Sequence, residues 1–233
     1  MKKLGIIGGM SWESTQTYYR LLNEGVRARL GGLHSCELLL YSFDFARIEG
    51  LQSDGAWDQA SDEMVRAALS LKAAGADYLL IATNTMHKMA QAVEEACALP
   101  VLHIADATAY AIKENGVTAP LLLATNFTMT QDFYKGHLKD HHNITAIVPK
   151  EAHRSVIHDV IYHELCQGKI HDESRASYLD IISHYHQAGL IDSVIFGCTE
   201  IGLLLSAKDV NLPVFDTTEI HCHYALDRLL SHR

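Results

Sequence analysis

The stretch Ile195-Phe-Gly-Cys-Thr-Glu-Ile-Gly-Leu203 carries the pattern that decides the fold. Residues 193–196 predict a short buried strand that ends at Gly197, and a helix-like run follows Glu200. Cys198 is therefore expected at the end of a strand, beside backbone N–H groups that lower the pKa of a thiol. Ligands of open α/β sheets bind at the carboxyl ends of the strands, so the pattern predicts a functional site at Cys198.

The same pattern occurs earlier in the chain, where Thr83 stands in the place of the cysteine. Similar segments recur in the same order with a nearly constant offset, which indicates an internal repeat. The pairs are 4–10 with 121–129, 74–85 with 188–200, and 99–106 with 212–219. One strand end thus carries a thiol and its counterpart does not.

Short apolar runs alternate with helix-like segments along the whole chain. The expected strands are 4–7, 36–42, 78–82, 101–104, 120–124, 144–148, 194–196 and 214–215. Continuous apolar strands between helices predict parallel sheets covered on both faces. We expect an α/β protein of two pseudo-symmetric, flavodoxin-like α/β/α half-domains, with the active site in the cleft between them. The first half-domain is expected at 1–105, completed by 212–233, and the second at 106–211.

The composition is that of a soluble globular protein, with 48% hydrophobic and 20% charged residues in a chain of 233. A formal net charge of −9 argues against a nucleic-acid partner. Five widely spaced cysteines without a Cys-x-x-Cys motif indicate a reducing compartment, with neither disulfides nor structural zinc. No segment is typical of a signal peptide or a membrane span, so a cytoplasmic location is expected.

Two polar turns could carry chemistry beside the thiol. Thr83-Asn84-Thr85 offers hydroxyl, amide and N–H donors at a helix start, which suits a carboxylate or an oxyanion. The alternative is that these residues only cap the following helix, and Thr199-Glu200 has the same two interpretations. Cys198 itself is either a catalytic thiol or a buried structural cysteine.

The remaining motifs argue against nucleotide binding and against a metal site. Gly8-Gly9-Met10-Ser11 ends the first strand, with glycines that allow a close backbone approach and a serine able to cap the next helix, but it is not a nucleotide-binding fingerprint. Fifteen histidines include no metal-binding motif, so no metal is expected. His87 and His103 lie near the predicted site and are either groups that support it from behind or, the preferred interpretation, structural histidines.

Three motifs, Gly-Gly-Met-Ser, Thr-Asn-Thr-Met-His and Gly-Cys-Thr-Glu-x-x-Leu-Leu, resemble those of the aspartate/glutamate racemases, which are amino-acid racemases that use no cofactor. The resemblance covers essentially the whole chain and is nearest to the bacterial branch described as L-aspartate/glutamate-specific or broad-specificity. It implies an amino-acid substrate held between two strand-end loops, and proton transfer without pyridoxal phosphate. It makes Cys198 and Thr83 the catalytic residues. The substrate-binding residues that it implies are Met10, Gln52, Asn84, Thr85, Thr125, Thr199 and Glu200.

The sequence departs from the family pattern in two places. Most members carry a cysteine in each half, whereas Thr83 is a poor base, so α-proton abstraction is predicted to be faster for the enantiomer that faces Cys198, which the resemblance makes the L form. Gln52 and Glu164 lie where family members devoted to aspartate hold the distal carboxylate with basic side chains. Neutral polar amino acids such as homoserine are therefore alternative substrates, unless Arg47, Lys88 or Lys135 compensates.

Two other functions remain open from the sequence. A single cysteine also suits a decarboxylase or a cis–trans isomerase of small dicarboxylic acids, and a two-lobed protein without turnover would only bind its ligand. Pseudo-symmetric halves of this size often pair, so a homodimer is expected, although no sequence feature specifies its interface.

Overall fold

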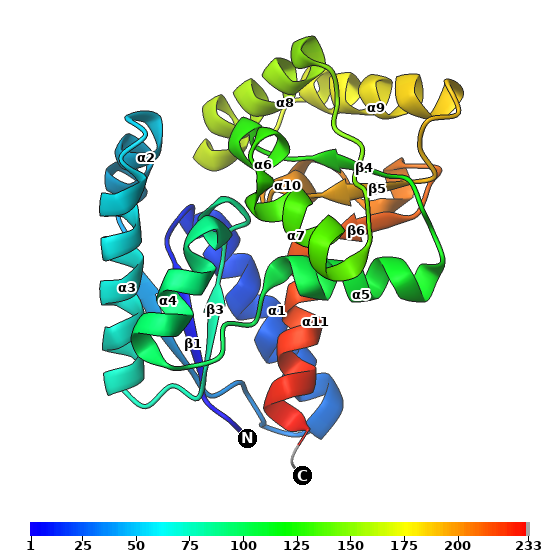
Figure 1. The fold of residues 1–233 in the computed structure, drawn as a ribbon. Coiled ribbons are helices and arrows are strands. Elements are labelled where there is room, and N and C mark those ends of the chain that lie inside the picture. The colour runs from blue at the N-terminus through cyan, green and yellow to red at the C-terminus, as the bar shows by residue number, and fades with distance from the viewer. Residues whose placement is uncertain (232–233) are drawn as a thin grey trace. The chain divides into compact units, whose positions relative to one another are not determined.

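The structure is a computed structural model that describes residues 1–231. Short strands alternate with helices throughout, and the strands form two parallel three-stranded sheets, so the predicted α/β class is confirmed (Figure 1). The chain divides into two compact units. The first contains Met1–Ile104 and the described residues from His221 onward, and the second contains Ala105–Ile220.

The first unit is built on a sheet of order β2-β1-β3, in which both pairs of neighbours are parallel. Its elements are β1 (Leu4–Gly8), α1 (Trp12–Leu30), β2 (Leu38–Ser42), α2 (Phe45–Ser53), α3 (Trp57–Ala73), β3 (Tyr78–Ile81), a 3₁₀ helix (Thr85–Met89) and α4 (Ala90–Cys97). Helix α5 (Ile104–Asn115) begins where the chain leaves this unit, and α11 (Thr217–Leu230) carries the chain back into it.

Alternating side chains of the first sheet divide between two hydrophobic cores, because successive residues of a strand point to opposite faces. Ile7 packs in one core with residues of α3 and α4, such as Met64 and Val93. Ile6 packs in the other with residues of α1 and α11, such as Leu22 and Leu226. Helices therefore cover both faces of the sheet, as continuous apolar strands predict.

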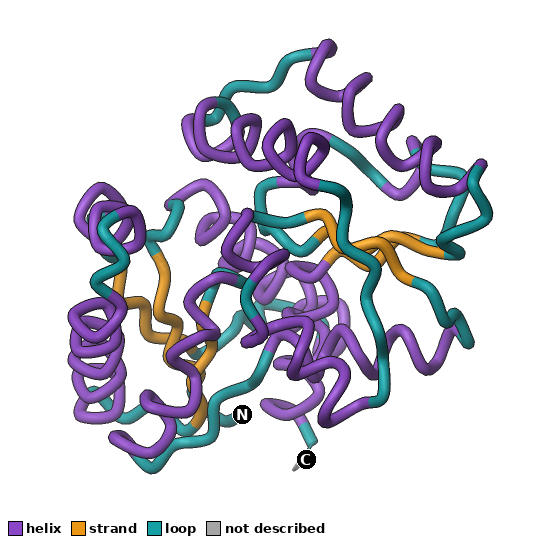
Figure 2. The backbone as a smooth tube through the Cα atoms, turned by 45° about the horizontal axis from the view of Figure 1, so that its top comes forward, coloured by secondary structure: helices purple, strands orange, loops and turns teal. Residues whose placement is uncertain are grey.

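The second unit has a sheet of order β4-β5-β6, again parallel. Helices α8 and α9 lie on one side of this sheet and α5 on the other (Figures 1 and 2). The elements are β4 (Pro120–Leu123), α6 (Asn126–Thr130), α7 (Asp132–His142), α8 (Glu151–His163), α9 (Asp172–Gln187), β5 (Ser193–Phe196), α10 (Ile201–Leu204) and β6 (Val214–Asp216), with 3₁₀ helices at Leu165–Gln167 and Ala207–Asp209.

Two of the predicted strands are wrong in extent. The expected strands 101–104 and 144–148 are reduced to single parallel bridges, from Val101 to Leu79 and from Ile147 to Leu121. The reason is local, since α5 already starts at Ile104 and Pro149, which has no N–H to donate, follows the other bridge. The expected boundary at 212 also differs from the structure. Val214–Asp216 pairs with β5, so the chain returns to the first unit only at His221.

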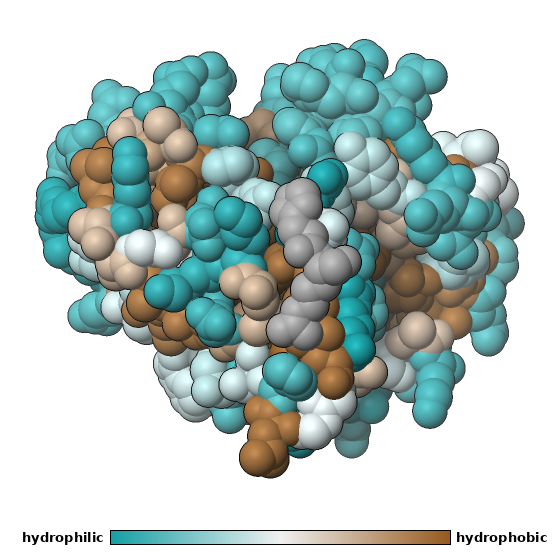
Figure 3. Space-filling view, turned by 90° about the horizontal axis from the view of Figure 1, so that it is seen from below, coloured by the Kyte–Doolittle hydropathy of each residue, from teal (hydrophilic) through white to brown (hydrophobic). Residues whose placement is uncertain are grey.

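The surface is largely hydrophilic on the face drawn in Figure 3, where hydrophobic residues occupy separate areas between hydrophilic ones. Scattered apolar residues are normal on a protein surface. Across residues 1–231, none of the helices combines the length and the apolar character needed to cross a bilayer.

Candidate active site

The thiol-bearing turn begins at Gly197, directly after β5. The Gly197 N–H donates to the carbonyl oxygen of Leu123 at 2.7 Å, so the turn is held against the end of β4. A Cβ atom at position 197 would come within 2.5 Å of Leu122 Cδ1 and 3.1 Å of Ala124 Cβ. Only glycine fits this approach, which explains why Gly197 precedes Cys198.

The Cys198 thiol is buried and shares one carboxylate oxygen with its neighbour. Its Sγ–H donates to Glu200 Oε2 at 2.9 Å, and the Thr199 hydroxyl donates to the same oxygen at 2.9 Å. Glu200 stands at the start of α10 without a side-chain capping bond. The carboxylate is therefore committed to the thiol and the threonine, and the interpretation of Glu200 as a mere helix cap is wrong.

The electrostatics of this turn differ from the expectation. Burial raises the pKa of the Cys198 thiol well above its usual value, and the nearby Glu200 and Cys166 raise it further. The backbone N–H of Glu200 lowers the pKa as expected, but burial and the negative neighbours outweigh it, so the expected net lowering does not occur. The thiol is protonated at neutral pH in this structure, and the group placed to take its proton is Glu200.

A buried tyrosine adjoins the same group of side chains. Tyr178 donates its hydroxyl hydrogen to the carbonyl of Ile157 at 2.9 Å. Its pKa is raised well above the usual value by burial, and then by Cys198 and other acidic groups, of which Glu164 is one. Glu164 accepts a hydrogen bond from Ser174 at 2.5 Å. The surroundings of the thiol are therefore acidic.

The neighbouring strand ends complete the turn region of the second unit. Thr125, which follows β4, is buried, and its Oγ1 accepts the N–H of Thr128 at 3.4 Å as the cap of α6. After β6, the hydroxyl of Thr217 donates to the carbonyl of Phe196 at 2.7 Å. Residues from all three strands thus meet at the carboxyl edge of this sheet, where parallel sheets bind ligands.

Sequence reasoning missed Asp216 and Thr217 as members of this edge. Asp216 Oδ1 accepts the N–H groups of Thr218 at 2.8 Å and Glu219 at 3.2 Å, at the start of α11. Burial raises the pKa of Asp216 to about 6. The repeat that aligns 212–219 with 99–106 places both residues directly after a short apolar run, and that position is the sequence feature that identifies them.

The first unit presents its own polar turn at the end of β3. Thr83 and Cys198 are each the second residue after the end of their strand, so the repeat aligned them correctly. Thr83, Asn84 and Thr85 are all buried. Asn84 occupies the cap position of the 3₁₀ helix but makes no side-chain capping bond. The helix-cap interpretation of Asn84 is therefore also wrong.

The glycine turn after β1 lies in the same unit. Gly9 has φ of +81°, and a Cβ atom there would collide with the backbone of Phe43. Its N–H donates to Thr15 Oγ1 at 2.8 Å, and that hydroxyl donates to the carbonyl of Ser11 at 2.9 Å. Ser11 itself makes no side-chain capping bond to α1, contrary to expectation.

Met10 and Gln52 join this first group. Met10 and Met86 belong to one hydrophobic core, and the Gln52 amide donates to Met86 Sδ at 3.1 Å. Each of the two units thus gathers its own set of predicted site residues. The first set is Met10, Gln52, Thr83, Asn84 and Thr85, and the second is Thr125, Cys198, Thr199 and Glu200.

The basic side chains that might have bound a distal carboxylate are engaged elsewhere. Arg47 forms an ion pair with Glu63. Lys88 Nζ lies 4.7 Å from the centroid of the Trp57 ring, and Lys135 pairs with Asp132 at 3.0 Å.

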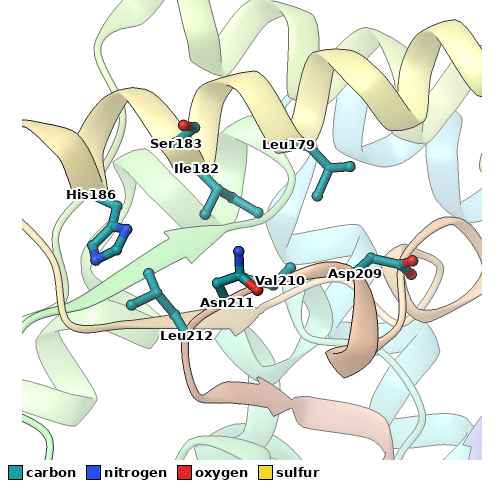
Figure 4. Close-up of a pocket in the computed structure, with 8 residues that line it drawn as sticks. All are labelled: Leu179, Ile182, Ser183, His186, Asp209, Val210, Asn211 and Leu212. Atoms are coloured by element: carbon teal, nitrogen blue, oxygen red, sulfur yellow. The ribbon is translucent and has the colours of Figure 1, made fainter.

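A cavity of about 200 Å³ lies in the second unit between α9 and the segment before β6 (Figure 4). Its lining includes His186, Asp209 and Asn211. The segment 210–212 precedes β6, whereas Cys198 follows β5, and the two strands are parallel. The cavity therefore lies at the amino edge of the sheet, opposite to the edge that carries the thiol.

Comparison with known proteins agrees with the geometry. Two α/β units, each with a polar turn at a strand end, define a two-unit α/β protein. A sequence model of the Asp/Glu/hydantoin racemase family matches residues 7–225, and the chain belongs to that family. It is accordingly an isomerase of the racemase type.

Solved structures and a characterised relative support this assignment. A putative Asp/Glu racemase from Yersinia pestis is 51% identical, with a TM-score of 0.91 over 99% of this chain and 100% of the other. An aspartate racemase homologue from Pyrococcus horikoshii OT3 is 34% identical, with a TM-score of 0.85 and full coverage of both chains. The broad specificity amino-acid racemase RacX of Bacillus subtilis is 21% identical over 92% of each chain.

Proposed function

We propose that the protein interconverts the L and D forms of aspartate or glutamate without pyridoxal phosphate, with Cys198 as the base and Thr83 in place of a second cysteine. The observation that carries this proposal is the hydrogen bond from Cys198 Sγ to Glu200 Oε2 at 2.9 Å. A buried thiol with a raised pKa needs an acceptor for its proton, and Glu200 is in direct contact with it.

The proton transfers balance in this scheme. Cys198 gives its proton to Glu200, and the thiolate then takes the α-proton of the L enantiomer. The carbanion receives a proton on its other face from the Thr83 hydroxyl, and solvent water returns a proton to the resulting alkoxide. The hydroxide that remains takes the extra proton from Glu200, which restores the carboxylate and closes the cycle. Donation by Thr83 is favourable because a carbanion is a much stronger base than an alkoxide. The reverse reaction needs abstraction of the D-form proton by the Thr83 alkoxide, which a weakly acidic hydroxyl forms only rarely, so exchange from this face is slow.

The α-C–H bond of an amino acid is weakly acidic, so the developing negative charge on the substrate carboxylate needs donors. Among the proposed binding residues, Asn84 and Thr85 carry side-chain donors of the required kind. Desolvation of the substrate would strengthen each of these hydrogen bonds.

A second candidate is a racemase that prefers neutral polar amino acids such as homoserine. One observation favours it, namely that Gln52 is an amide while Arg47 and Lys88 already interact with Glu63 and Trp57. The relative RacX is named for broad specificity, which agrees with this alternative.

The test is a chiral assay without added cofactor, on both enantiomers of aspartate, glutamate and homoserine. We expect racemisation of at least one pair, and a loss of at least ~10³-fold in Cys198→Ser, since the serine hydroxyl is a far weaker acid than a thiol. The variant keeps the size of the side chain, so its melting temperature should stay near that of the wild type. Carbon dioxide release from a small dicarboxylic acid, or tight binding without turnover, would instead favour the decarboxylase or the binding protein.

We further propose that the enzyme works in the cytoplasm as a homodimer. Five free cysteines are compatible with a reducing compartment. Light scattering coupled to gel filtration tests the dimer, for which the expected mass is twice the 25.9 kDa of the chain.

A further inference from the structure

His87 lies directly behind the Thr83 turn and contacts it through one ring nitrogen. Its Nδ1 is 2.7 Å from the carbonyl oxygen of Thr83, and its Nε2 is 3.1 Å from the backbone nitrogen of Ile104. A backbone N–H can only donate, so Nε2 accepts the hydrogen bond from Ile104. Nδ1 therefore carries the hydrogen and donates it to Thr83, and the imidazole is neutral and fixed in one tautomer.

A second buried histidine, His221, lies next to His87, and its hydrogen bonds fix its tautomer in the same way. His221 Nε2 is 2.6 Å from the carbonyl oxygen of Leu102, which can only accept, so Nε2 carries the hydrogen. Its Nδ1 then accepts the hydroxyl hydrogen of Tyr18 at 3.0 Å. Burial lowers the pKa of His221 to about 3, so this ring is neutral at physiological pH too.

The two imidazoles belong to one packed group in the first unit. The ring centroids of His87 and His221 are 5.6 Å apart, and those of His87 and His103 are 4.7 Å apart. Two chains of hydrogen bonds run through this group. In one, Tyr18 donates to His221, which donates to the carbonyl of Leu102. In the other, Ile104 donates to His87, which donates to the carbonyl of Thr83.

Residues at both points where the chain passes between the units make hydrogen bonds with the histidines of this group. The chain leaves the first unit after Ile104 and re-enters it at His221. Ile104 is hydrogen-bonded to His87, which also bonds the Thr83 turn, and His221 is hydrogen-bonded to Leu102, two residues before Ile104. The ring contact between His87 and His221 brings these two sets of hydrogen bonds together.

We propose that His87 is a positioning residue for Thr83, which fixes the Thr83 carbonyl through its Nδ1–H and ties the turn to the crossing segment through its Nε2. The proposal rests on the proposed function, in which the Thr83 hydroxyl returns a proton to the substrate. Proton return requires a well-placed donor, and a misplacement of about 1 Å costs roughly 100-fold in rate. His87 acts through the Thr83 backbone and touches no reacting atom in this scheme.

Two substitutions separate the two nitrogens of His87. In His87→Asn the amide NH₂ lies near the position of Nδ1, so the bond to Thr83 can be kept. In His87→Gln the amide oxygen lies near the position of Nε2, so the bond from Ile104 can be kept while the bond to Thr83 is lost. The two variants thus form a matched pair of similar polarity.

We expect His87→Gln to lower kcat for racemisation by about 30- to 100-fold with less than about threefold change in KM. Exchange of the L-substrate α-proton with solvent, which depends on Cys198, should stay within about threefold of the wild type. His87→Asn should retain racemisation within about fivefold. Equal losses of racemisation, exchange and melting temperature in both variants would mean a purely structural histidine, and unchanged racemisation in His87→Gln would also overturn the proposal.

A spectroscopic readout makes the proposal independent of activity. Nitrogen-15 NMR of labelled wild type, with the His87 signals assigned by their absence in both variants, should show a neutral Nδ1–H imidazole at pH 7. An Nε2–H tautomer or a protonated ring would contradict the inference. Failure of the wild type to racemise any substrate would sink the proposed function, while the tautomer would still decide whether His87 holds Thr83 as described.

Discussion

The turns after β3 and β5 stand at matching positions in two like units, yet they are chemically different. The turn at Cys198 carries an acid and its acceptor, since the thiol donates to the carboxylate of Glu200. The turn at Thr83 carries a hydroxyl, and the backbone carbonyl of Thr83 accepts a hydrogen bond from the neutral imidazole of His87. In the proposed mechanism, the strand end at Cys198 removes a proton and the strand end at Thr83 holds a donor in place.

The sheets themselves also match in detail. Each has three full strands and one residue that adds a single parallel bridge at an edge, Val101 beside β3 and Ile147 beside β4. In the repeat, Val101 of the first unit takes the position of β6 in the second, and Ile147 of the second unit takes the position of β2 in the first. Both sheets thus have four strand positions, and in each unit a different one is reduced to a single bridged residue. The scaffold is therefore conserved between the units while the turns differ.

The largest effect is expected from Glu200→Gln, which removes the proton acceptor from the thiol-bearing turn. Racemisation should fall by about 10²- to 10⁴-fold, the usual contribution of a positioned acid or base. The pKa of Cys198 should fall at the same time, because Glu200 raises it. Iodoacetamide labelling of Cys198, measured against pH with Cys198→Ser as the blank, should therefore accelerate while catalysis slows. Slower labelling would contradict this prediction.

Thr83→Cys should make the two turns alike. A thiol at position 83 is a better base than a hydroxyl, so solvent exchange of the D-substrate α-proton should rise by about 10- to 100-fold. Nuclear magnetic resonance in D₂O measures this directly, and Thr83→Ser is the matched control because it keeps a hydroxyl and should leave exchange slow. Equal exchange rates in the Cys and Ser variants would show that position 83 is not the second proton-transfer group.

Gly197→Ala tests the close approach that supports the thiol-bearing turn. The added methyl would lie 2.5 Å from Leu122 Cδ1 and 3.2 Å from the Leu123 carbonyl oxygen, so we expect a loss of about 2–3 kcal/mol in unfolding free energy. Gly50→Ala in α2 is the control, because no atom lies within 4 Å of its Cβ position. That change should be neutral or stabilising by up to ~1 kcal/mol. Urea denaturation of both variants measures the difference, and similar midpoints would refute the packing argument.

Asp216→Asn probes the smallest effect and depends on pH. Burial raises the pKa of Asp216 to about 6, above its ordinary value of 3.8, so between these pH values the folded state holds a proton that the unfolded state has lost. Stability attributable to Asp216 therefore falls as pH rises from about 4 to about 6. The asparagine can still accept from the N–H groups of Thr218 and Glu219. We expect it to stabilise the protein by ~1–2 kcal/mol at pH 7.5 and to lose that gain near pH 4, as thermal melts at the two values would show.

The repeat in the sequence predicted the fold and the pairing of Thr83 with Cys198, because strand-end motifs depend on local patterns of a few residues. It did not predict the state of the thiol, since the raised pKa of Cys198 comes from burial and from Glu200, and burial is a property of the packed structure. The chain likewise gave no sign that His87 and His221 share one group, because those residues are far apart in sequence. The same limit applies to Arg47 and Lys88, whose partners Glu63 and Trp57 appear only on folding.

Under the proposed function, the turn at Cys198 removes the α-proton of a bound amino acid much faster than the turn at Thr83 does. The equilibrium constant of a racemisation is one, so kcat/KM for the full reaction is equal in both directions and cannot reveal the difference. The direct measurement is the rate at which each enantiomer of aspartate, glutamate and homoserine loses its α-proton signal in D₂O, before the other enantiomer accumulates. We expect fast exchange of the L form and slow exchange of the D form, with the fast exchange of the L form lost in Cys198→Ser. Equal initial exchange rates for the two enantiomers would contradict it.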